Sequence, residues 1–527
     1  MIDASTNKQG HAMQQRKFTG VRAAALALSI AMIALALINL HRANAGVTTE
    51  RVMLGPTPVT IFRANPSLDD KASPLVLIAH GFAGSQQLMQ GFAVTLAKNG
   101  FIAVTFDYYG HGRNLEPLRG DVTKVDGATQ KLLEQTREVA DYALELPGVS
   151  GELALLGHSM ASDIIVRYAQ EDPRVDATVA VSMFSPAVTA EAPKNLLVIV
   201  GGWEGFLKEE ALRVLGLITD KPEAGQTFES NGAAEQRRVA IAEGVEHVGV
   251  LYSQTSMAEA SDWLHRVYAK SLLADQGYRD KRGGWVVMLL FGLCALAWPL
   301  ASLLPTVSSP PLGASLTWKQ LLPASLVPAI GTPLALFWFP ADFLGVLVGG
   351  YLAVHFAVYG LLTLLCLWWL KRGIDREQSI THWGRFALSG ALATLFTAAV
   401  ISLALNIYVT SFAIPTLRIP LLLVMLVGTL CYFLADEWLA HGSHTAQGGH
   451  LFTRVCFLVS LGIAVALSFE DLFFLLIIAA VIIIYFLVYG LFSRWVYQAT
   501  GHPAVGGIAN AVAFAWALAA VFPLMAP

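Results

Sequence analysis

The sequence predicts an α/β domain, a mainly parallel sheet flanked by helices, inserted in an all-α bundle of membrane-spanning helices. Hydrophobic residues make up 55% of the chain and charged residues only 14%, against about 25% charged residues in an average soluble protein. Of the 38 acidic residues, 30 lie between Val47 and Arg282. Short β-rich runs alternate with helical periodicity in that same stretch, which indicates a water-soluble domain with a covered parallel sheet.

The first elements are a predicted cytoplasmic tail at residues 1–22 and a membrane anchor at residues 23–40. At about 1.5 Å per residue the anchor is long enough to cross most of a hydrocarbon core. Four basic residues precede it, which keeps the N-terminus in the cytoplasm: Lys8, Arg16, Lys17 and Arg22. An alternative is a cleavable signal peptide, because Ala43-Asn44-Ala45 resembles a processing site. Both interpretations place the following domain outside the cytoplasm, in the periplasm if the membrane is a bacterial inner membrane.

Residues 284–527 are predicted to form a membrane domain of about eight helices, which gives nine spans in all. The apolar segments cover residues 284–304, 321–339, 343–370, 386–409, 419–435, 455–469, 472–492 and 505–525. Alternation from a cytoplasmic N-terminus places most basic loop residues inside, as the charge rule requires: Lys319, Lys371, Arg372, Arg376, Arg385, Arg454 and Arg494. Arg418 is the exception. Four prolines near the third span, from Pro323 to Pro340, predict a kinked or broken helix.

Charge and cysteine content exclude several classes of protein. The net charge of −3 offers no basic surface for nucleic acid. All four cysteines fall in predicted spans, so disulfides do not stabilise the outer domain: Cys294, Cys366, Cys431 and Cys456. No cofactor is predicted, and the oligomeric state is left open.

Seven strands and four helices are predicted in the soluble domain. The strands cover residues 59–63, 75–79, 102–106, 153–156, 178–182, 196–200 and 238–242. The helices lie near residues 87–98, 129–146, 159–171 and 257–270. The pentapeptide Gly157-His158-Ser159-Met160-Ala161 therefore joins a central strand to a helix. Small residues on both sides of a serine permit a sharp strand-to-helix turn that exposes the hydroxyl at the carboxyl edge of the sheet.

Residues 48–272 resemble the α/β-hydrolase superfamily in three motifs that occur in the family's order. His80-Gly81-Phe82-Ala83-Gly84 follows a strand as the oxyanion-loop motif does, and residues 107–112 resemble the family's D-x-x-G-x-G turn. The resemblance implies that Ser159 is a nucleophile and that the backbone N–H groups of Phe82 and Met160 form an oxyanion hole.

A serine hydroxyl needs a histidine to take its proton and a carboxylate to orient that histidine. The resemblance implies the order serine, acid, histidine. Glu204 follows the predicted strand 196–200 and is the expected acid, where aspartate is more common; Glu209 and Glu210 are alternatives. His247 follows the last strand and is the expected base. His265 lies within an amphipathic helix and is a poor candidate.

The substrate region is predicted to lack a large lid, because only about residues 183–195 separate the two strands between which the family inserts one. The cleft is then open, as in proteins resembling dienelactone hydrolases and small esterases, or covered by the membrane part. Possible pocket residues are His80, Gly81, His158 and Trp203. A modest flap at residues 206–236, with an apolar piece at 212–218, would lean toward the bilayer and admit a lipid-like acyl ester. Expected partners are membrane lipids and a small-molecule or lipid-like ester.

The membrane domain offers few chemical groups. His355 lies within an apolar span, where an ionisable residue is a functional candidate by default; a neutral histidine bonded to a neighbouring helix is as good an interpretation. Five residues suggest a metal site but lack tight ligand spacing, so no metal is predicted: Asp436, Glu437, His441, His444 and His450.

Two classes of function fit these features. The first is a membrane-anchored serine hydrolase, an esterase, lipase or acyl-transferring relative with a Ser-Glu-His triad. The second is a transporter or membrane scaffold whose hydrolase-like domain is a binding module. The complete set of nucleophile, acid and histidine favours the enzyme.

Overall fold

The structure, a computed structural model, describes residues 4–65, 72–122, 124–229, 235–269, 277–340, 344–370, 380–442 and 445–526. The chain forms two compact units. The α/β unit comprises Leu37–Val287, Asn406–Ser411 and Pro523–Pro527. The helical unit comprises Met1–Ala36, Met288–Leu405 and Phe412–Phe522. Two short segments from the C-terminal half of the sequence therefore belong to the α/β unit, which the sequence did not predict.

A nine-stranded sheet in the order β1-β2-β4-β3-β5-β6-β7-β9-β8 forms the centre of the α/β unit. The strands are β1 (Val47–Leu54), β2 (Thr57–Ala64), β3 (Ser73–Ala79), β4 (Ile102–Phe106), β5 (Val149–His158), β6 (Val175–Val181), β7 (Leu196–Gly201), β8 (Thr227–Glu229) and β9 (Gln236–Ala242). The six strands from β4 to β9 in this order run parallel, and β1, β2 and β8 pair antiparallel at the edges. All seven predicted strands are present.

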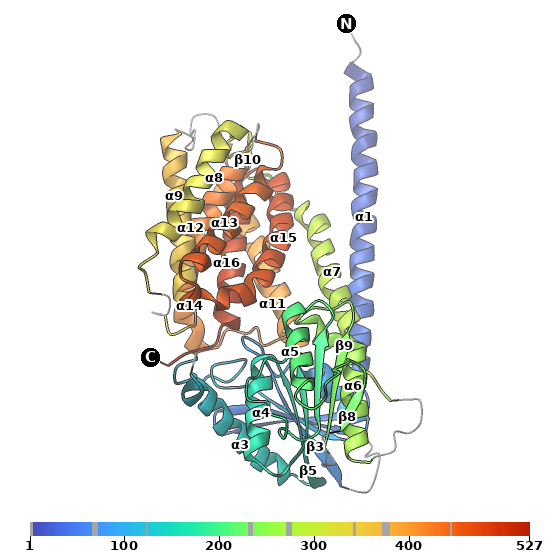
Figure 1. Ribbon diagram of the computed structural model, residues 1–527. Helices are drawn as coiled ribbons and strands as arrows, with labels where there is room; N and C mark the ends of the chain where they lie inside the picture. The colour runs from blue at the N-terminus through green and yellow to red at the C-terminus, as the bar shows by residue number, and fades with distance from the viewer. Residues whose placement is uncertain are drawn as a thin grey trace. The chain divides into compact units, whose positions relative to one another are not determined.

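Helices cover both faces of the sheet (Figure 1). One face carries α2 (Gln90–Lys98) and α6 (Gln254–Val267), and the other carries α3 (Gln130–Leu144), α4 (Met160–Glu171) and α5 (Gly205–Leu215). Successive β3 side chains alternate between these layers: Val76 and Ile78 pack in the first, and Leu75 and Leu77 in the second. This alternation follows from the two-residue period of a strand.

The expected apolar flap at residues 212–218 is wrong. Residues 205–215 form α5, and Val214 and Leu215 are buried in a core cluster with β7 and β9 residues such as Val198 and Val239. Because the sheet takes up these apolar side chains, no apolar flap remains there. The connection between β6 and β7, residues 182–195, contains no helix or strand and no large lid.

Among the described residues, eight helices are long and apolar enough to cross a membrane. Each of them lies wholly or partly in the helical unit. They are Gly20–Ala43, Arg282–Ala301, Gly349–Trp369, Trp383–Tyr408, Thr416–Ala440, Gly449–Leu467, Ala479–Thr500 and Pro503–Val521. In the element numbering these belong to α1 (Ala4–Ala43), α7 (Arg282–Ala301), α9 (Gly349–Trp369), α10 to α11 (Trp383–Thr394 and Ile401–Tyr408), α12 (Ile419–Ala440), α13 (Gly449–Leu467), α15 (Phe474–Thr500) and α16 (Pro503–Val521). Helices α9, α12 and α16 pack together.

The predicted third span differs from the other spans. Its helix, α8 (Trp318–Ala335), contains Pro323, Pro328 and Pro333 and is continuous, so the predicted break is absent. It ends before Phe339, and with 18 residues it is long enough but less apolar than the eight helices above. Three basic residues of the loop that served to predict the orientation of the chain in the membrane lie outside the described residues: Lys371, Arg372 and Arg376.

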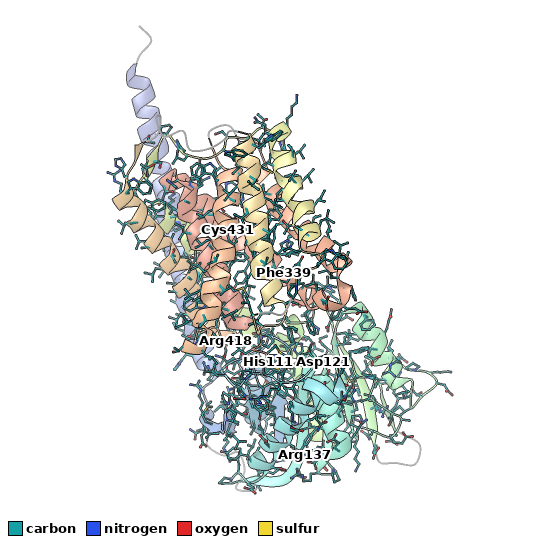
Figure 2. The ribbon with its side chains drawn as sticks, turned by 90° about the vertical axis from the view of Figure 1, so that its left-hand side faces the viewer. His111, Asp121, Arg137, Phe339, Arg418 and Cys431 are labelled. Atoms are coloured by element: carbon teal, nitrogen blue, oxygen red, sulfur yellow. The ribbon has the colours of Figure 1, made fainter. Side chains whose placement is uncertain are left out.

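Arg418, the exception to the charge rule, is a buried structural cation at the start of α12 (Figure 2). Its side chain is 1% exposed, and Nη1 donates to the main-chain oxygens of Ala519 and Phe522 at 2.9 and 2.7 Å. A cation at the C-terminal carbonyls of α16 also complements the helix dipole. The charge rule, which concerns loop residues, therefore does not apply to Arg418.

The cysteines, including Cys431 on α12, are free.

Candidate active site

Ser159 lies on a sharp turn between β5 and α4. Its backbone dihedrals, φ 54° and ψ −118°, are unfavourable for a residue with a side chain, and its side chain is half-buried at the carboxyl edge of the sheet. A Cβ atom at Gly157 would lie 2.8 Å from the main-chain oxygen of Ala161. The turn therefore requires glycine at position 157, as the sequence motif predicts.

A continuous chain of hydrogen bonds joins Ser159, His247 and Glu204. Ser159 Oγ lies 2.8 Å from His247 Nε2, and His247 Nδ1 lies 2.6 Å from Glu204 Oε1. An ionised carboxylate only accepts, so Nδ1–H donates to Glu204 and the Nε2 lone pair faces the serine hydroxyl. The His247 side chain is 37% exposed. This geometry suits removal of the Ser159 proton by His247.

Glu204 is the N-cap of α5, directly after β7, and is 9% exposed. Its Oε2 accepts from Gly201 N–H at 2.6 Å and from Ser182 Oγ at 2.7 Å. Burial alone would raise the pKa of Glu204, but the hydrogen bonds from His247, Gly201 and Ser182 outweigh it and leave that pKa below its usual value. The carboxylate is thus held ionised and fixed in orientation.

The alternative acids lie elsewhere. Glu209 is exposed on α5, and Glu210 pairs with Arg213 at 2.6 Å. Sequence reasoning missed Ser182, which binds Glu204 at the end of β6. The available signal was its position: it follows the strand adjacent to the strand that carries Ser159, at the same edge of the sheet.

His158 supports the loop that carries His247. Its Nε2–H donates to the main-chain oxygen of His247 at 2.9 Å, and the residue is only 6% exposed. Burial, together with the neighbouring His247, lowers the pKa of His158 to about 3. The ring is therefore neutral at physiological pH. Its burial favours a positioning role over the predicted contact with substrate.

The oxyanion loop lies directly against the serine turn. A Cβ atom on Gly81 would lie 3.0 Å from Ser159 Cβ and 3.0 Å from His158 Nδ1, so only glycine permits this approach. Phe82 follows Gly81. Met160 is the first residue of α4, where the N–H groups of a helix have no intrahelical partner. The structure brings both residues to Ser159, and their role as oxyanion donors stays a prediction.

His80 links the oxyanion loop to the turn after β4. Its Nδ1–H donates to Gly81 O at 2.8 Å, and its Nε2 accepts from Tyr108 N–H at 3.1 Å. The side chain is fully buried, which lowers the pKa of His80 to about 4. Because both nitrogens bind backbone, His80 is not available to substrate. His111, whose ring packs against Phe82 with 5.9 Å between centroids, is labelled in Figure 2.

Four exposed apolar residues lie close in the sequence to the hydrogen-bonded residues. They are Phe184, Trp203, Phe206 and Val248, which are 51%, 72%, 66% and 44% exposed. Each lies within two residues of Ser182, Glu204 or His247 in the sequence, and the rings of Phe184 and Phe206 are 5.6 Å apart. We call these four residues the apolar rim. Only Trp203 was predicted.

Residues 70–238 match the protein-family model described as serine aminopeptidase, S33. The chain carries an α/β-hydrolase domain. This assignment agrees with the parallel sheet, the serine turn after β5 and the order of serine, acid and histidine. The comparison with curated proteins gave no match.

Three solved structures are similar to part of this chain. A hypothetical protein from Pseudomonas aeruginosa is 13% identical with a TM-score of 0.33, over 42% of this chain and 94% of that chain. A protein from Thermus thermophilus is 20% identical with a TM-score of 0.30, over 41% and 98%. A protein described as a candidate dienelactone hydrolase from Klebsiella pneumoniae subsp. pneumoniae is 17% identical with a TM-score of 0.32, over 43% and 99%.

In the helical unit, His355 bonds to neighbouring residues, with Nε2 3.1 Å from Ser460 Oγ and Nδ1 3.4 Å from Tyr351 Oη.

The expected lack of tight ligand spacing near residue 437 is wrong. Glu437, His441 and His450 each place a possible ligand atom within 4.8 Å of the others. His444 lies outside the described residues.

Proposed function

We propose that the protein is a membrane-integrated serine hydrolase that cleaves an ester through an acyl-enzyme. The chain of hydrogen bonds from Ser159 through His247 to Glu204 carries the proposal. Ser159 Oγ attacks the carbonyl carbon while His247 Nε2 takes the hydroxyl proton. That proton leaves with the alcohol, and the second half-reaction transfers the acyl group from Ser159 to water. The N–H groups of Phe82 and Met160 would stabilise the negative oxygen.

The eight apolar helices support a location in a membrane. The basic residues before the apolar part of α1 support a cytoplasmic N-terminus, and thus an α/β-hydrolase domain on the extracytoplasmic face. In a bacterial inner membrane this face is periplasmic. A membrane-impermeant probe of the serine distinguishes the two sides, and the experiment is described with the Ser159 variant below.

The apolar rim supports a lipid-like substrate. Exposed aromatic side chains beside a partly exposed histidine would bury the acyl or alcohol chain of an ester, and each buried CH₂ group contributes about 0.8 kcal/mol. No large lid covers this rim within the α/β unit as described. We therefore propose an ester with a medium or long hydrocarbon chain.

Trp203→Ala and Phe206→Ala are expected to lower kcat/KM for an eight-carbon ester by about ten-fold, equivalent to roughly 1.4 kcal/mol of lost apolar contact. The effect on a two-carbon ester should stay below about two-fold, because a short chain does not reach the rim. A series of p-nitrophenyl esters measures the ratio. Met53→Ala, a substitution of an exposed residue of β1, is the control; equal losses on both esters would contradict the proposed substrate class.

Labelling of the wild-type protein by a fluorophosphonate tests the hydrolase itself. These probes react with an activated serine, so labelling supports the proposed chemistry. An unlabelled but folded protein would instead favour the binding-module interpretation.

A further inference from the structure

A cluster of buried ionisable side chains lies in the helical unit at the C-terminal end of α12. Glu437 lies in the last turn of α12, and His441 is the residue that follows this helix. His450 and Arg454 come from the first turns of α13. Glu437 is fully buried, and His441 and Arg454 are 7% and 4% exposed. The proposed hydrolysis uses none of these residues.

The spacing of the cluster suits a metal ion. One atom from each of Glu437, His441 and His450 lies within 4.8 Å of the other two, and His450 Nε2 is 3.7 Å from Glu437 Oε1. Ligand atoms around a tetrahedral zinc ion with bonds of about 2.0–2.1 Å are roughly 3.3 Å apart. Small side-chain movements would therefore close the site around an ion.

The hydrogen bonds already present orient these groups. His441 Nδ1–H donates to the main-chain oxygen of Glu437 at 2.9 Å, which leaves the lone pair on Nε2. A backbone carbonyl in this role is a common support for a metal-binding imidazole. Arg454 Nη2 donates to Glu437 Oε1 at 3.0 Å, and the other carboxylate oxygen, Oε2, lies 3.4 Å from His441 Nδ1.

Among the described residues, several buried polar atoms of this cluster lack a hydrogen-bond partner. Glu437 Oε2, His450 Nε2 and Asp436 Oδ2 are buried and have no hydrogen-bond partner among the described residues. A buried polar atom without a partner is costly. Glu437, which is fully buried, thus supplies an unpartnered oxygen of the kind that an ion would bind.

The charges at the cluster also favour a cation. Two buried carboxylates, Asp436 and Glu437, share the guanidinium of Arg454, which lies 3.8 and 3.0 Å from them. His441 and His450 also face Glu437, at 3.4 Å from Oε2 and 3.7 Å from Oε1. A cation bound beside the two carboxylates would interact favourably with them.

We propose that Glu437, His441 and His450 bind one divalent first-row transition-metal ion, of which Zn²⁺ is the representative. Two imidazoles and one carboxylate are the ligand types that such ions prefer over Mg²⁺ or Ca²⁺. The site joins α12 to α13, and three protein ligands leave a coordination position open.

Metal analysis of the purified full-length protein tests this site. We expect about one equivalent of zinc by mass spectrometry after growth with Zn²⁺ and gel filtration without chelator. Glu437→Gln and His450→Ala should each lower that content at least ten-fold. His382→Ala, in which an exposed histidine at the start of α10 is replaced, should keep it.

A second measurement keeps the test independent of variants that fail to fold. Chelator-treated wild-type protein titrated with Co²⁺ should develop visible absorption that Zn²⁺ abolishes. Wild-type protein with less than a tenth of an equivalent of metal and no Co²⁺ absorption would overturn the proposal. Equal metal content in wild type and in a folded His450→Ala variant would overturn it as well.

A different observation concerns the segment Asn406–Ser411, which comprises the last three residues of α11 and the three residues that follow and which belongs to the α/β unit. It binds the residues that follow the oxyanion loop. Ser411 N–H donates to Ser85 Oγ at 3.1 Å, and Thr410 Oγ1 lies 2.9 Å from the same atom. Gln87 binds both ends of the segment: Nε2 donates to Asn406 O, and Oε1 accepts from Ser411 Oγ, both at 2.7 Å.

The same short stretch is fixed on its other side by the sheet. Gln86 N–H and Gln86 Nε2 donate to Asp107 at 2.8 and 3.0 Å, and Asp107 lies directly after β4. Residues 85–87 are thus held between Asp107 and the segment Asn406–Ser411. An oxyanion hole stabilises a transition state only if its donors are fixed before reaction.

We infer that the segment Asn406–Ser411 positions the oxyanion loop of the α/β-hydrolase domain. The inference rests on the proposed function. Ser411 and Gln87 are positioning residues, because they act through the backbone of residues 81–87 and do not touch the reacting atoms.

Gln87→Ala and Ser411→Ala are expected to lower kcat about ten-fold with KM changed less than two-fold, since loss of an oxyanion donor itself costs about 10²- to 10³-fold. The inhibition constant of a boronic acid, whose tetrahedral adduct occupies the oxyanion hole, should rise in parallel. Ser411→Thr keeps the hydroxyl and should restore kcat. Gln90→Ala, at the start of α2, is the control.

The outcomes separate this inference from the proposed function. An unlabelled wild-type protein overturns both. Normal fluorophosphonate labelling of the wild type with an unchanged kcat and boronate affinity in Gln87→Ala and Ser411→Ala overturns the positioning role alone.

Discussion

Ser159→Ala is expected to abolish fluorophosphonate labelling and to lower kcat/KM by about 10⁴- to 10⁶-fold. The substitution removes the oxygen that lies 2.8 Å from His247 Nε2, so no acyl-enzyme forms. The rate that remains reflects binding and oxyanion stabilisation alone. Alanine should be tolerated, because Ser159 is only half-buried and its unusual φ is already imposed by the turn.

Labelling of intact cells and of opened membranes with a membrane-impermeant fluorophosphonate measures both activity and orientation. Equal labelling of the two samples is expected for an extracytoplasmic domain. Ser150→Ala, at an exposed position of β5, is the matched control and should label fully. Persistent labelling of Ser159→Ala would exclude Ser159 as the nucleophile, and labelling confined to opened membranes would exclude the proposed orientation.

Glu204→Gln is expected to lower kcat by about 10⁴-fold. The carboxylate of Glu204 accepts three hydrogen bonds, from His247, Gly201 and Ser182. A glutamine amide has a single acceptor oxygen, so its NH₂ group must face a donor. If it faces His247, the imidazole is held in the tautomer that cannot take the Ser159 proton.

The matched control is Glu209→Gln on the same helix, which should keep wild-type activity because Glu209 is exposed. The pKa of Glu204 lies below its usual value, and an unperturbed glutamate has a pKa of about 4.3. The carboxylate is therefore ionised at every pH above about 5, and the loss should be present throughout that range. A loss below ten-fold in Glu204→Gln, or a larger loss in Glu209→Gln, would contradict the assignment.

The sheet could be predicted because its central strands are buried on both faces. Such strands consist of continuous apolar runs, as at Leu75–Ala79 and Ile102–Phe106. β1 could not be predicted in the same way, since most of its side chains are exposed and carry no apolar pattern. The segment 212–218 was assigned wrongly, because apolar composition alone does not distinguish a helix that packs on a sheet from one that faces lipid.

The long apolar helices were predictable from length and hydropathy, with an exception at α8, and the charge pattern had an exception at Arg418. α8 contains three prolines and is not apolar enough to count with the other eight. Arg418 looked like an error in the charge pattern until its carbonyl partners at the end of α16 were known. The first case reflects local composition, whereas the second depends on partners that are distant in the sequence.

The sequence by itself predicted the α/β class, the serine turn and the candidate site residues Ser159, Glu204 and His247, because each of these residues follows a strand whose pattern is local. Only the tertiary structure decided what supports them. Ser182 contacts Glu204 from the end of the neighbouring strand β6, His158 contacts the main-chain oxygen of His247, and the segment Asn406–Ser411 reaches Ser85 and Gln87 from more than 300 residues away. Glu437 and His450 come together in the same way, where two helices pack. Contacts between distant residues arise from packing, and local periodicity carries no information about them.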